Sequence, residues 1–347
     1  MAVRLSDIAA SLGVSEATVS LALSGNGRVA ESTRQRVVAA ANELGYRPNT
    51  AARALRTDAT RTIGLIVSDV ANPFFGELAR EVERHAGELG YAVMLCNSDE
   101  DASRQDDYLL DLLAGSRVDG VLLVPASSAT PGLRAAGASK AKLVIVDRPI
   151  TVPGRGDAAK HLRALPTVRS DTSTALAEAA ALLVTLGHRR IGVVAPPQDT
   201  PLGRVRTREI RDALVEAGVS PRSILVEAGD FRENSGYRAT SALLEQRHRP
   251  TAIIAADGPM AIGALKAARD AGLRVPLDLS LMSFDDAPWL ELLDPPMTAI
   301  AQPIPQIAGA AVDALIALIK GSPQHDPPAQ QPVCTFVRRA SCGMPPA

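Results

Sequence analysis

Eight side chains of this 347-residue sequence have the chemistry to hold a polyhydroxylated ring, and each comes after a predicted strand. Carboxylates accept hydrogen bonds from paired hydroxyls, an arginine donates them in a fork, and a phenylalanine offers a face for stacking. Open α/β sheets bind ligands beyond the carboxyl ends of their strands, so we expect these side chains to line one cleft. The candidates are Asp69, Asn72, Phe74, Asp147, Arg206, Phe231, Asp257 and Asp285.

Two series of alternating strands and helices must position these side chains. The first series has predicted strands at 63–67, 91–96, 120–124 and 142–146, with helices at 74–89 and 103–114. The second has strands at 191–195, 224–227, 252–255 and 280–284, with helices at 207–217, 235–245 and 260–271. Such β-α-β repetition builds a parallel sheet with helices on both faces. The sequence therefore predicts two α/β lobes, each a doubly wound parallel sheet.

The N-terminal stretch from Arg4 to Ser24 follows a different pattern. Its apolar residues fall at helical spacing until Gly13, and Ser15 can cap a second helix with Val19 on its inner face. Two short helices joined by a glycine-containing turn form a helix-turn-helix, whose second helix enters the DNA major groove. A plain structural pair of helices would show the same pattern.

A third helix should follow, opened by a capping box at residues 32–35. Its expected apolar side consists of Val37, Val38, Ala41 and Leu44. Residues 1–61 contain eight Arg and five Asp or Glu, a balance of +3, whereas the whole chain has a formal charge of −1. A basic head on an acidic body suits a DNA contact confined to one end.

The bulk composition excludes several classes of protein. Hydrophobic residues make up 46% and charged residues 22%, as in globular proteins, and a chain of this length exceeds one ordinary core. The three cysteines show no CxxC spacing, so we expect free thiols, no metal and no cofactor. We find neither a secretory signal nor an apolar run that could span a bilayer, and we therefore expect a cytoplasmic protein without a membrane partner.

Several segments in order resemble the LacI/GalR (lactose repressor) family of bacterial transcription regulators: DIAASLGVSEATVSLALSG, ESTRQRVVAAANELGYRPN, AARALRT, TRTIGLIVSDVANPFF, LGHRRIGVV, SFDD and LLDPPMTAIAQP. The resemblance implies a helix-turn-helix DNA-binding domain at 1–58, with a hinge helix at about 49–57. It implies an effector-binding and dimerisation domain at 62–343, of periplasmic-binding-protein type. We place lobe one at about 62–162 and 292–320, and lobe two at about 163–290 and 324–343.

The resemblance also assigns residues to DNA. The family reads bases from the positions of Glu16, Ala17 and Leu21, where most members have an arginine in place of Leu21. A leucine can instead meet a thymine methyl group, and a glutamate can accept from a cytosine amine. Leu55 matches a wedge into the minor groove, with burial against the body as the alternative. The remaining predicted DNA-binding positions are Ser15, Thr18, Ser20, Ser24, Asn49 and Ala52.

The eight cleft candidates also match ligand positions of the family. One departure is that Asp257 occupies the place of a usual asparagine and Gly258 that of a usual helix-capping aspartate. Three carboxylates of this set would then face one cation, Arg206. We expect that balance to repel a phosphate or carboxylate ligand and to favour a neutral polyol such as a sugar.

The leading hypothesis is a homodimeric repressor, not an enzyme, on a near-palindromic operator and controlled by a small carbohydrate. The alternative is a solute-binding protein without a role in gene regulation. An enzyme lacks support because no nucleophile elbow is present and His188 precedes a strand on the side away from the cleft. The segment 154–165 is expected to be a surface insertion.

Overall fold

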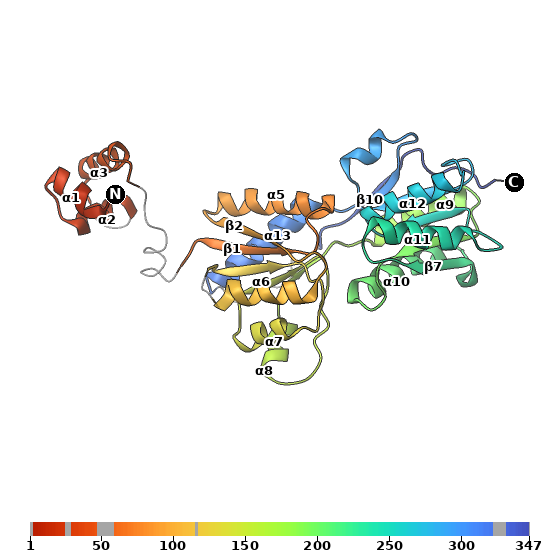
Figure 1. The fold of residues 1–347 in the computed structure, drawn as a ribbon, viewed down its shortest axis with the longest axis horizontal. Helices are drawn as coiled ribbons and strands as arrows, with labels where there is room; N and C mark the ends of the chain where they lie inside the picture. The colour runs from red at the N-terminus through yellow and green to blue at the C-terminus, as the bar shows by residue number, and fades with distance from the viewer. Residues whose placement is uncertain (1–2, 25–28, 47–58, 115–116, 322–330, 347) are drawn as a thin grey trace. The chain divides into compact units, whose positions relative to one another are not determined.

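The computed structural model describes residues 3–24, 29–46, 59–114, 117–321 and 331–346. The chain forms two compact units, Met1–Thr60 and Arg61–Ala347. We describe each unit by itself, and Figure 1 labels the elements.

The first unit contains three helices around a small apolar core. They are α1 (Leu5–Leu12), α2 (Glu16–Ser24) and α3 (Glu31–Glu43). Gly13 ends α1 with a φ of 64°, a left-handed conformation that glycine adopts without steric cost. The Ser15 hydroxyl accepts from the Thr18 backbone N–H at 3.1 Å, which is the predicted cap of α2. Ile8, Val19 and Val37 are fully buried.

The predicted start of the third helix is wrong. α3 begins at Glu31, one residue before the proposed capping box, and Ala30 precedes it without a side-chain cap. Its apolar face is also rotated, because Val38 and Leu44 are exposed whereas Ala40 is buried beside Val37.

The first sheet of the second unit is entirely parallel, in the order β2-β1-β3-β4-β5. Its strands are β1 (Thr62–Val67), β2 (Ala92–Asn97), β3 (Gly120–Leu123), β4 (Leu143–Val146) and β5 (Thr167–Val168). Its helices are α5 (Pro73–Glu88), α6 (Ala102–Ala114), α7 (Pro131–Ala138), α8 (Asp157–Arg163) and α13 (Ile304–Ile319). Figure 1 shows α5 and α13 on one face of the sheet and α6 and α7 on the other.

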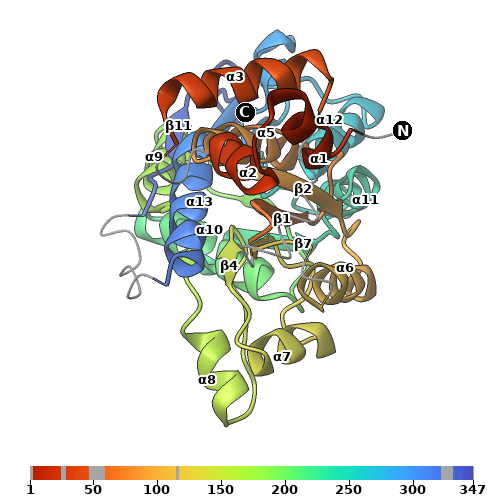
Figure 2. The same cartoon turned by 90° about the vertical axis from the view of Figure 1, so that its left-hand side faces the viewer.

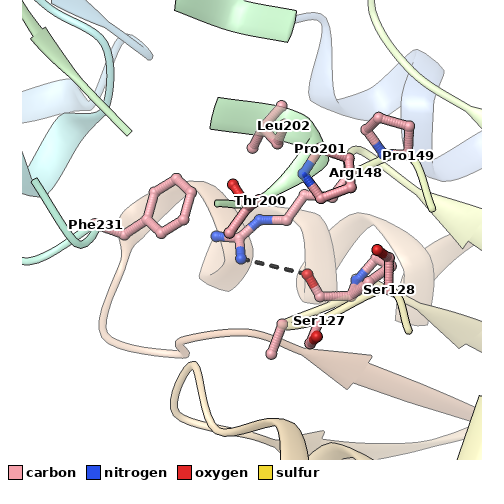
Figure 3. A pocket seen from close by; sticks show the side chains of 10 residues that line it. Ser127, Ser128, Arg148, Pro149, Thr200, Pro201, Leu202 and Phe231 are labelled. Carbon is pink, nitrogen blue, oxygen red and sulfur yellow. Dashed lines mark hydrogen bonds between the residues drawn. The ribbon is translucent and has the colours of Figure 1, made fainter. Parts of the chain in front are cut away.

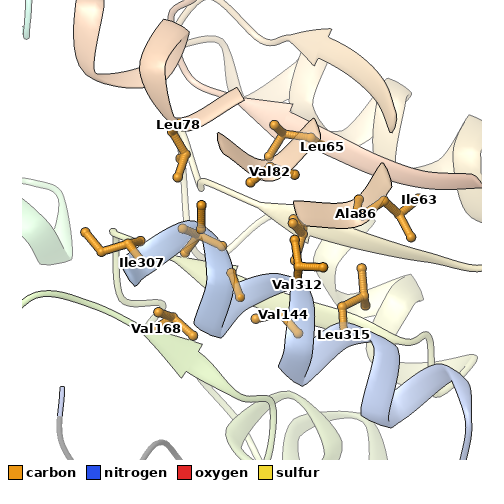
Figure 4. Packing of buried hydrophobic residues seen from close by; sticks show 14 of the residues in the cluster. Ile63, Leu65, Leu78, Val82, Ala86, Val144, Val168, Ile307, Val312 and Leu315 are labelled. Atoms are coloured by element: carbon orange, nitrogen blue, oxygen red, sulfur yellow. The ribbon is translucent and has the colours of Figure 1, made fainter. Parts of the chain in front are cut away.

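The core under α5 and α13 joins segments far apart in the sequence. Figure 4 shows Ile307, Val312 and Leu315 of α13 beside Leu78 and Val82 of α5, against the strands. All five side chains are almost fully buried. The first lobe is therefore complete only when the chain returns to it after the second lobe.

The second sheet has the order β11-β10-β9-β8-β6-β7, with β11 antiparallel to β10. Its strands are β6 (Ile191–Ala195), β7 (Ile224–Ala228), β8 (Ala252–Ala255), β9 (Ser280–Phe284), β10 (Thr298–Ala301) and β11 (Thr335–Val337). Its α-helices are α9 (Ser173–Thr185), α10 (Pro201–Glu216), α11 (Glu233–Leu244) and α12 (Gly258–Asp270). Two short 3₁₀ helices, η1 (Pro221–Ser223) and η2 (Pro288–Leu292), complete this lobe. The helices α9 and α10 pack into one buried cluster, and α11 and α12 pack into another.

The chain crosses between the sheets later than the predicted lobe boundaries. β5 pairs with β4 in the first sheet, so the first crossing follows Val168, not residue 162. β10 pairs with β9 in the second sheet, so the return to lobe one follows Ala301, not residue 291.

The segment 154–165 is not a plain surface insertion. It forms α8, whose Ala159 and Leu162 are buried, and α8 lies beside α7 in both views (Figures 1 and 2). Gly137 of α7 permits this approach, because a Cβ there would lie 2.8 Å from the Ala158 carbonyl oxygen. The expectation failed because the small residues Gly137 and Ala159, together with Leu162, are enough to pack a short helix against α7.

Candidate functional site: a polar cluster between the two lobes

Side chains from the carboxyl ends of both sheets meet in one buried cluster. Arg206 of α10 places a guanidinium nitrogen 3.8 Å from an Asp147 carboxylate oxygen, which follows β4 of the first lobe. Asn72, at the start of α5, donates through Nδ2 to Asp257 Oδ2 at 3.4 Å, across to the second lobe. These four residues are buried. Residues that were predicted from their positions after strands, and that lie far apart in the sequence, are thus neighbours in the structure.

The backbone is strained at the positions that present this cluster. Asp147, Phe231 and Asp285 have φ values of 62°, 67° and 70°, in the left-handed region that non-glycine residues rarely occupy. Asp99 and Glu100, at 55° and 58°, are strained in the same way. Strain of this kind costs on the order of 1–3 kcal/mol per residue and gathers at functional sites. Its concentration here favours a binding role.

Besides the ion pair with Asp147, Arg206 is held by two further contacts. One Nη donates to the Ala256 carbonyl at 3.1 Å, and the guanidinium lies 4.0 Å from the centre of the Phe284 ring. Its helix α10 begins at Pro201, capped by the Thr200 hydroxyl, so Arg206 lies in the second turn and does not open the helix as predicted. The side chain therefore points to the site from a rigid element.

Arg148 is a second buried cation, which the sequence reasoning missed. It donates two hydrogen bonds of 2.6 Å to the Glu100 carboxylate and one of 3.4 Å to the Pro125 carbonyl. Its guanidinium lies 4.2 Å from the Phe231 ring of the second lobe, an arrangement visible in Figure 3. Among the residues that the structure describes, its Nε has no hydrogen-bond partner, although it lies 4.0 Å from an Asp147 carboxylate oxygen. Its position could have identified it as a site residue, since Arg148 directly follows the predicted site residue Asp147.

Two carboxyl groups of the cluster have raised pKa values. Burial, and then repulsion from Asp285, raise the pKa of Asp257 to about 8, although Arg206 opposes this shift. Burial raises the pKa of Asp285 to about 6, against the lowering effects of Arg206 and of a 2.8 Å hydrogen bond from Gln302. At neutral pH, Asp257 is therefore mostly protonated and Asp285 mostly ionised.

The predicted role of Asp257 needs correction. Its Oδ1 accepts from the Met260 backbone N–H at 3.3 Å, so Asp257 itself caps α12, the task predicted to be lost with Gly258. It is not an acceptor-only group, because its raised pKa leaves it a proton to donate. The predicted balance of three carboxylates against one cation is wrong for the same reason, and because Arg148 shares the site.

The other candidates lie nearby but differ in what they do. Phe74 is buried and meets Phe75 edge to face, with ring centres 5.1 Å apart. Asp69 accepts from the Ala71 backbone N–H at 2.9 Å, which closes a local turn. Gln302 was missed because β10 was absent from the predicted strands, although it follows that strand directly.

A cavity of about 500 Å³ borders the cluster between the lobes. Its lining includes Asn72, Phe74, Asp285 and Gln302, together with residues of α5, α12, η2 and α13. A second cavity of about 10 Å³, next to Arg148 and Phe231, has room for about one water molecule (Figure 3). Only the larger one has the volume of a small-molecule site.

Comparisons with known proteins identify the family. Residues 4–49 match the model of bacterial regulatory proteins of the lacI family, and residues 180–342 match a periplasmic binding protein-like domain. The HTH-type transcriptional repressor CytR of Escherichia coli (strain K12) is 34% identical over 324 residues, which are 93% of this chain and 91% of CytR. This chain belongs to the LacI family.

Solved structures of LacI-family regulators share the fold. A crystal structure of the lac repressor dimer bound to operator and the anti-inducer ONPF is 26% identical and has a TM-score of 0.82, covering 98% of this chain and 99% of that one. The complex of the regulator CelR with cellobiose is 30% identical with a TM-score of 0.70, covering 98% and 99%. The predicted family and fold class are therefore confirmed.

In this LacI-family chain, α2 presents all three predicted base-reading positions. Glu16 and Ala17 are exposed, as is Ser15 before the helix, and Leu21 has 44% of its surface exposed. Thr18 and Ser20 are half-buried. Asn49, Ala52 and Leu55 lie outside the described residues, and so does the Ser24 side chain.

His188 lies at the opposite end of the second sheet from the cluster. It is buried and bonds to the hydroxyls of Thr251 and Ser280 and to the Gly343 carbonyl, and burial lowers its pKa. Among the described residues, no group of three or more His, Cys, Asp or Glu side chains could hold a metal ion. Within the same part of the chain, no helix is long and apolar enough to cross a membrane.

Proposed function

We propose that this LacI-family regulator is a repressor whose operator binding is controlled by a neutral carbohydrate bound between its lobes. The observation that carries the effector proposal is the buried polar cluster beside a cavity of about 500 Å³. Asn72, Asp285 and Gln302 face that cavity and offer amide and carboxylate groups to hydroxyls. The CelR–cellobiose complex supports a carbohydrate as the class of effector.

The charges of the cluster favour a neutral ligand. Two guanidinium groups, Arg148 and Arg206, are each paired with a carboxylate, and Asp285 adds a further negative charge near neutral pH. Both cations of the cluster are thus already paired, which disfavours a phosphate or carboxylate ligand. A hydroxyl can both donate to the carboxylate oxygens and accept from the amides, so a polyol satisfies both sets of groups.

We infer that α2 reads operator bases through Glu16, Ala17 and Leu21, with Thr18, Ser20 and Ser24 at phosphates. Ser15, which caps the helix, is a further predicted DNA-binding position. Exposure of Glu16, Ala17 and Leu21 on one short helix supports the base-reading assignment, since a recognition helix reads bases with its exposed face. Asn49, Ala52 and Leu55 remain predictions for the hinge. An operator on the chromosome places this action in the cytoplasm.

We infer that the repressor is a homodimer and that β2 contributes to the contact. β2 is an edge strand, and its consecutive residues Met94 and Leu95 are 37% and 45% exposed. Neighbouring strand residues point to opposite faces, so both faces of this edge are partly bare. A bare apolar edge strand is usually paired or covered. A two-fold dimer matches a near-palindromic operator, and the related lac repressor structure is a dimer on its operator.

The contacts between lobes provide the element through which an effector can act. Asn72–Asp257, Arg206–Asp147 and an ion pair of 3.2 Å between Arg232 and Asp99 all join the two lobes. An effector that binds one arrangement of these contacts more tightly shifts the population toward it. That shift is the proposed source of control over DNA.

The DNA-binding head disfavours the alternative of a solute-binding protein without a regulatory role. We also infer that the chain is not an enzyme, because its relatives are regulators and the cluster pairs each cation with a carboxylate. A turnover assay with any saccharide that binds would expose an enzymatic activity.

Isothermal titration of the full chain with neutral sugars tests the effector proposal. Arg206→Ala should weaken the affinity of the sugar about ten- to a hundredfold, because it leaves the buried Asp147 carboxylate without its cation and so disrupts the polar cluster beside the cavity. Losing one partner of such a charge-assisted interaction costs about 1.5–3 kcal/mol. Arg208→Ala, an exposed arginine on the same helix, is the matched control and should bind as wild type. A preference for sugar phosphates over neutral sugars would contradict the proposal.

A further inference from the structure

The cavity of about 500 Å³ is larger than the polar part of the site requires. Three of its lining residues, Asn72, Asp285 and Gln302, belong to the polar cluster and can bind the hydroxyls of one sugar ring. A single pyranose ring would leave much of this volume empty. The unfilled part is lined by side chains of another chemical kind.

That second lining is apolar and comes from both lobes. α12 and η2 supply Pro259, Ile262, Pro288 and Trp289, while α13 supplies Ile304 and Pro305. Sugar rings present a C–H face that packs against aromatic rings, whereas their hydroxyls need polar partners. An apolar wall beside a polar one therefore suits a ligand with a second ring.

Trp289 is the residue best suited to hold such a ring. It is half-buried at its position in η2 and packs on one side against the core of the second lobe. None of the hydrogen bonds among the described residues uses its indole N–H, which remains a donor for a ligand hydroxyl. Tryptophan and tyrosine commonly combine an apolar face with one polar atom at binding sites.

The charged residues of α5 at the rim of the cavity are balanced in sign, which suits a neutral ligand. Glu77 and Arg80 of α5 line the cavity as an ion pair, so together they add no net charge to the rim. We propose that the effector is a neutral glycoside of at least two rings, with its second ring stacked on Trp289. This inference rests on the proposed function and adds the size of the ligand and the residue that selects it.

The sequence offers a direct spectroscopic test, because Trp289 is the single tryptophan of the chain. Tryptophan emission of the full chain would be followed during titration with methyl glucoside, phenyl glucoside, cellobiose and maltose, and with the galactose counterparts. We expect at least one two-ring ligand to bind about tenfold more tightly than its methyl glycoside and to change the emission.

Three variants distinguish stacking on Trp289 from a general loss of ligand binding. Trp289→Leu should remove the tenfold advantage of the second ring while the affinity for the methyl glycoside stays within about twofold, and Trp289→Phe should retain part of the advantage. Ile262→Phe narrows the cavity from α12, outside the core packing of Trp289, and should selectively weaken the two-ring ligand. Both affinities would be measured by calorimetry for these variants.

The outcomes distinguish this inference from the proposed function. Equal affinities for one-ring and two-ring ligands, or an emission unchanged at saturation, would overturn the role of Trp289 and leave a monosaccharide effector. Failure of every neutral saccharide to bind the wild-type chain would overturn the proposed function, and the inference with it.

Discussion

At the scale of single residues, the chemistry of the site is set by burial. Asp257 has the same side chain as any surface aspartate, yet its pKa is about 8 because it is buried near Asp285. Its ordinary pKa is 3.8. Folding therefore takes up a proton between these two pH values. The contribution of this group to stability is fully present below pH 3.8, falls as the pH rises, and is lost by about pH 8.

Asp257→Asn should remove this dependence on pH. The amide carries no charge and keeps an oxygen to cap α12, so the variant should gain stability relative to wild type as the pH rises from about 5 to about 8.5. Urea unfolding across this range measures the difference. Asp199→Asn, at an exposed aspartate of the same lobe, is the control. Parallel stability curves for wild type and Asp257→Asn would contradict the raised pKa.

The residues of the cluster were predictable to the extent that they follow strands. The rule that ligands bind beyond the carboxyl ends of strands selected Asp147, Asp257 and Asp285, because the apolar strands before them are easily recognised in the sequence. It missed Arg148, whose partner Glu100 lies after another strand, since no sequence pattern shows that pairing. It misjudged Asp257 because capping depends on where a helix begins, and protonation depends on burial.

At the scale of elements, strands were predicted more accurately than helix starts. β6, β8 and β9 have the predicted bounds, because buried parallel strands are short apolar runs between turns. α10 begins six residues earlier than predicted, at a Thr200-Pro201 pair that is itself a helix-start signal. α3 begins without a side-chain cap, so no sequence signal marked its first residue.

The burial of α8 leads to a prediction on stability. Leu162 is 5% exposed and packs beside α7, so Leu162→Ala should lower the free energy of unfolding by about 2 kcal/mol or more. Lys160→Ala, at an exposed position of the same helix, should change it by less than about 0.5 kcal/mol. Denaturant titration of the two variants decides between a packed helix and a surface insertion. Equal, small effects would favour the insertion.

At the scale of the whole molecule, the proposed dimer depends on an edge that one copy leaves bare. Leu95→Lys places a charge on β2 and should shift the protein from dimer to monomer at micromolar concentration, because charged side chains on an edge strand oppose pairing. Light scattering after size-exclusion chromatography gives the mass. Val215→Lys, at an equally exposed apolar position of α10, should leave the dimer intact. Loss of the dimer in the Val215 variant alone would place the interface elsewhere.

In the proposed mechanism, a ligand between the lobes controls DNA binding by the head. Fluorescence anisotropy of an operator duplex, selected by this chain from random sequences, would be measured with the full-length wild type and Arg206→Ala, with and without the saccharide that binds. We predict equal operator affinity of both proteins without saccharide. Saccharide at a concentration that saturates the wild type should change operator affinity of the wild type only, since Arg206→Ala weakens effector binding. A variant that responds to saccharide as the wild type does would contradict the account.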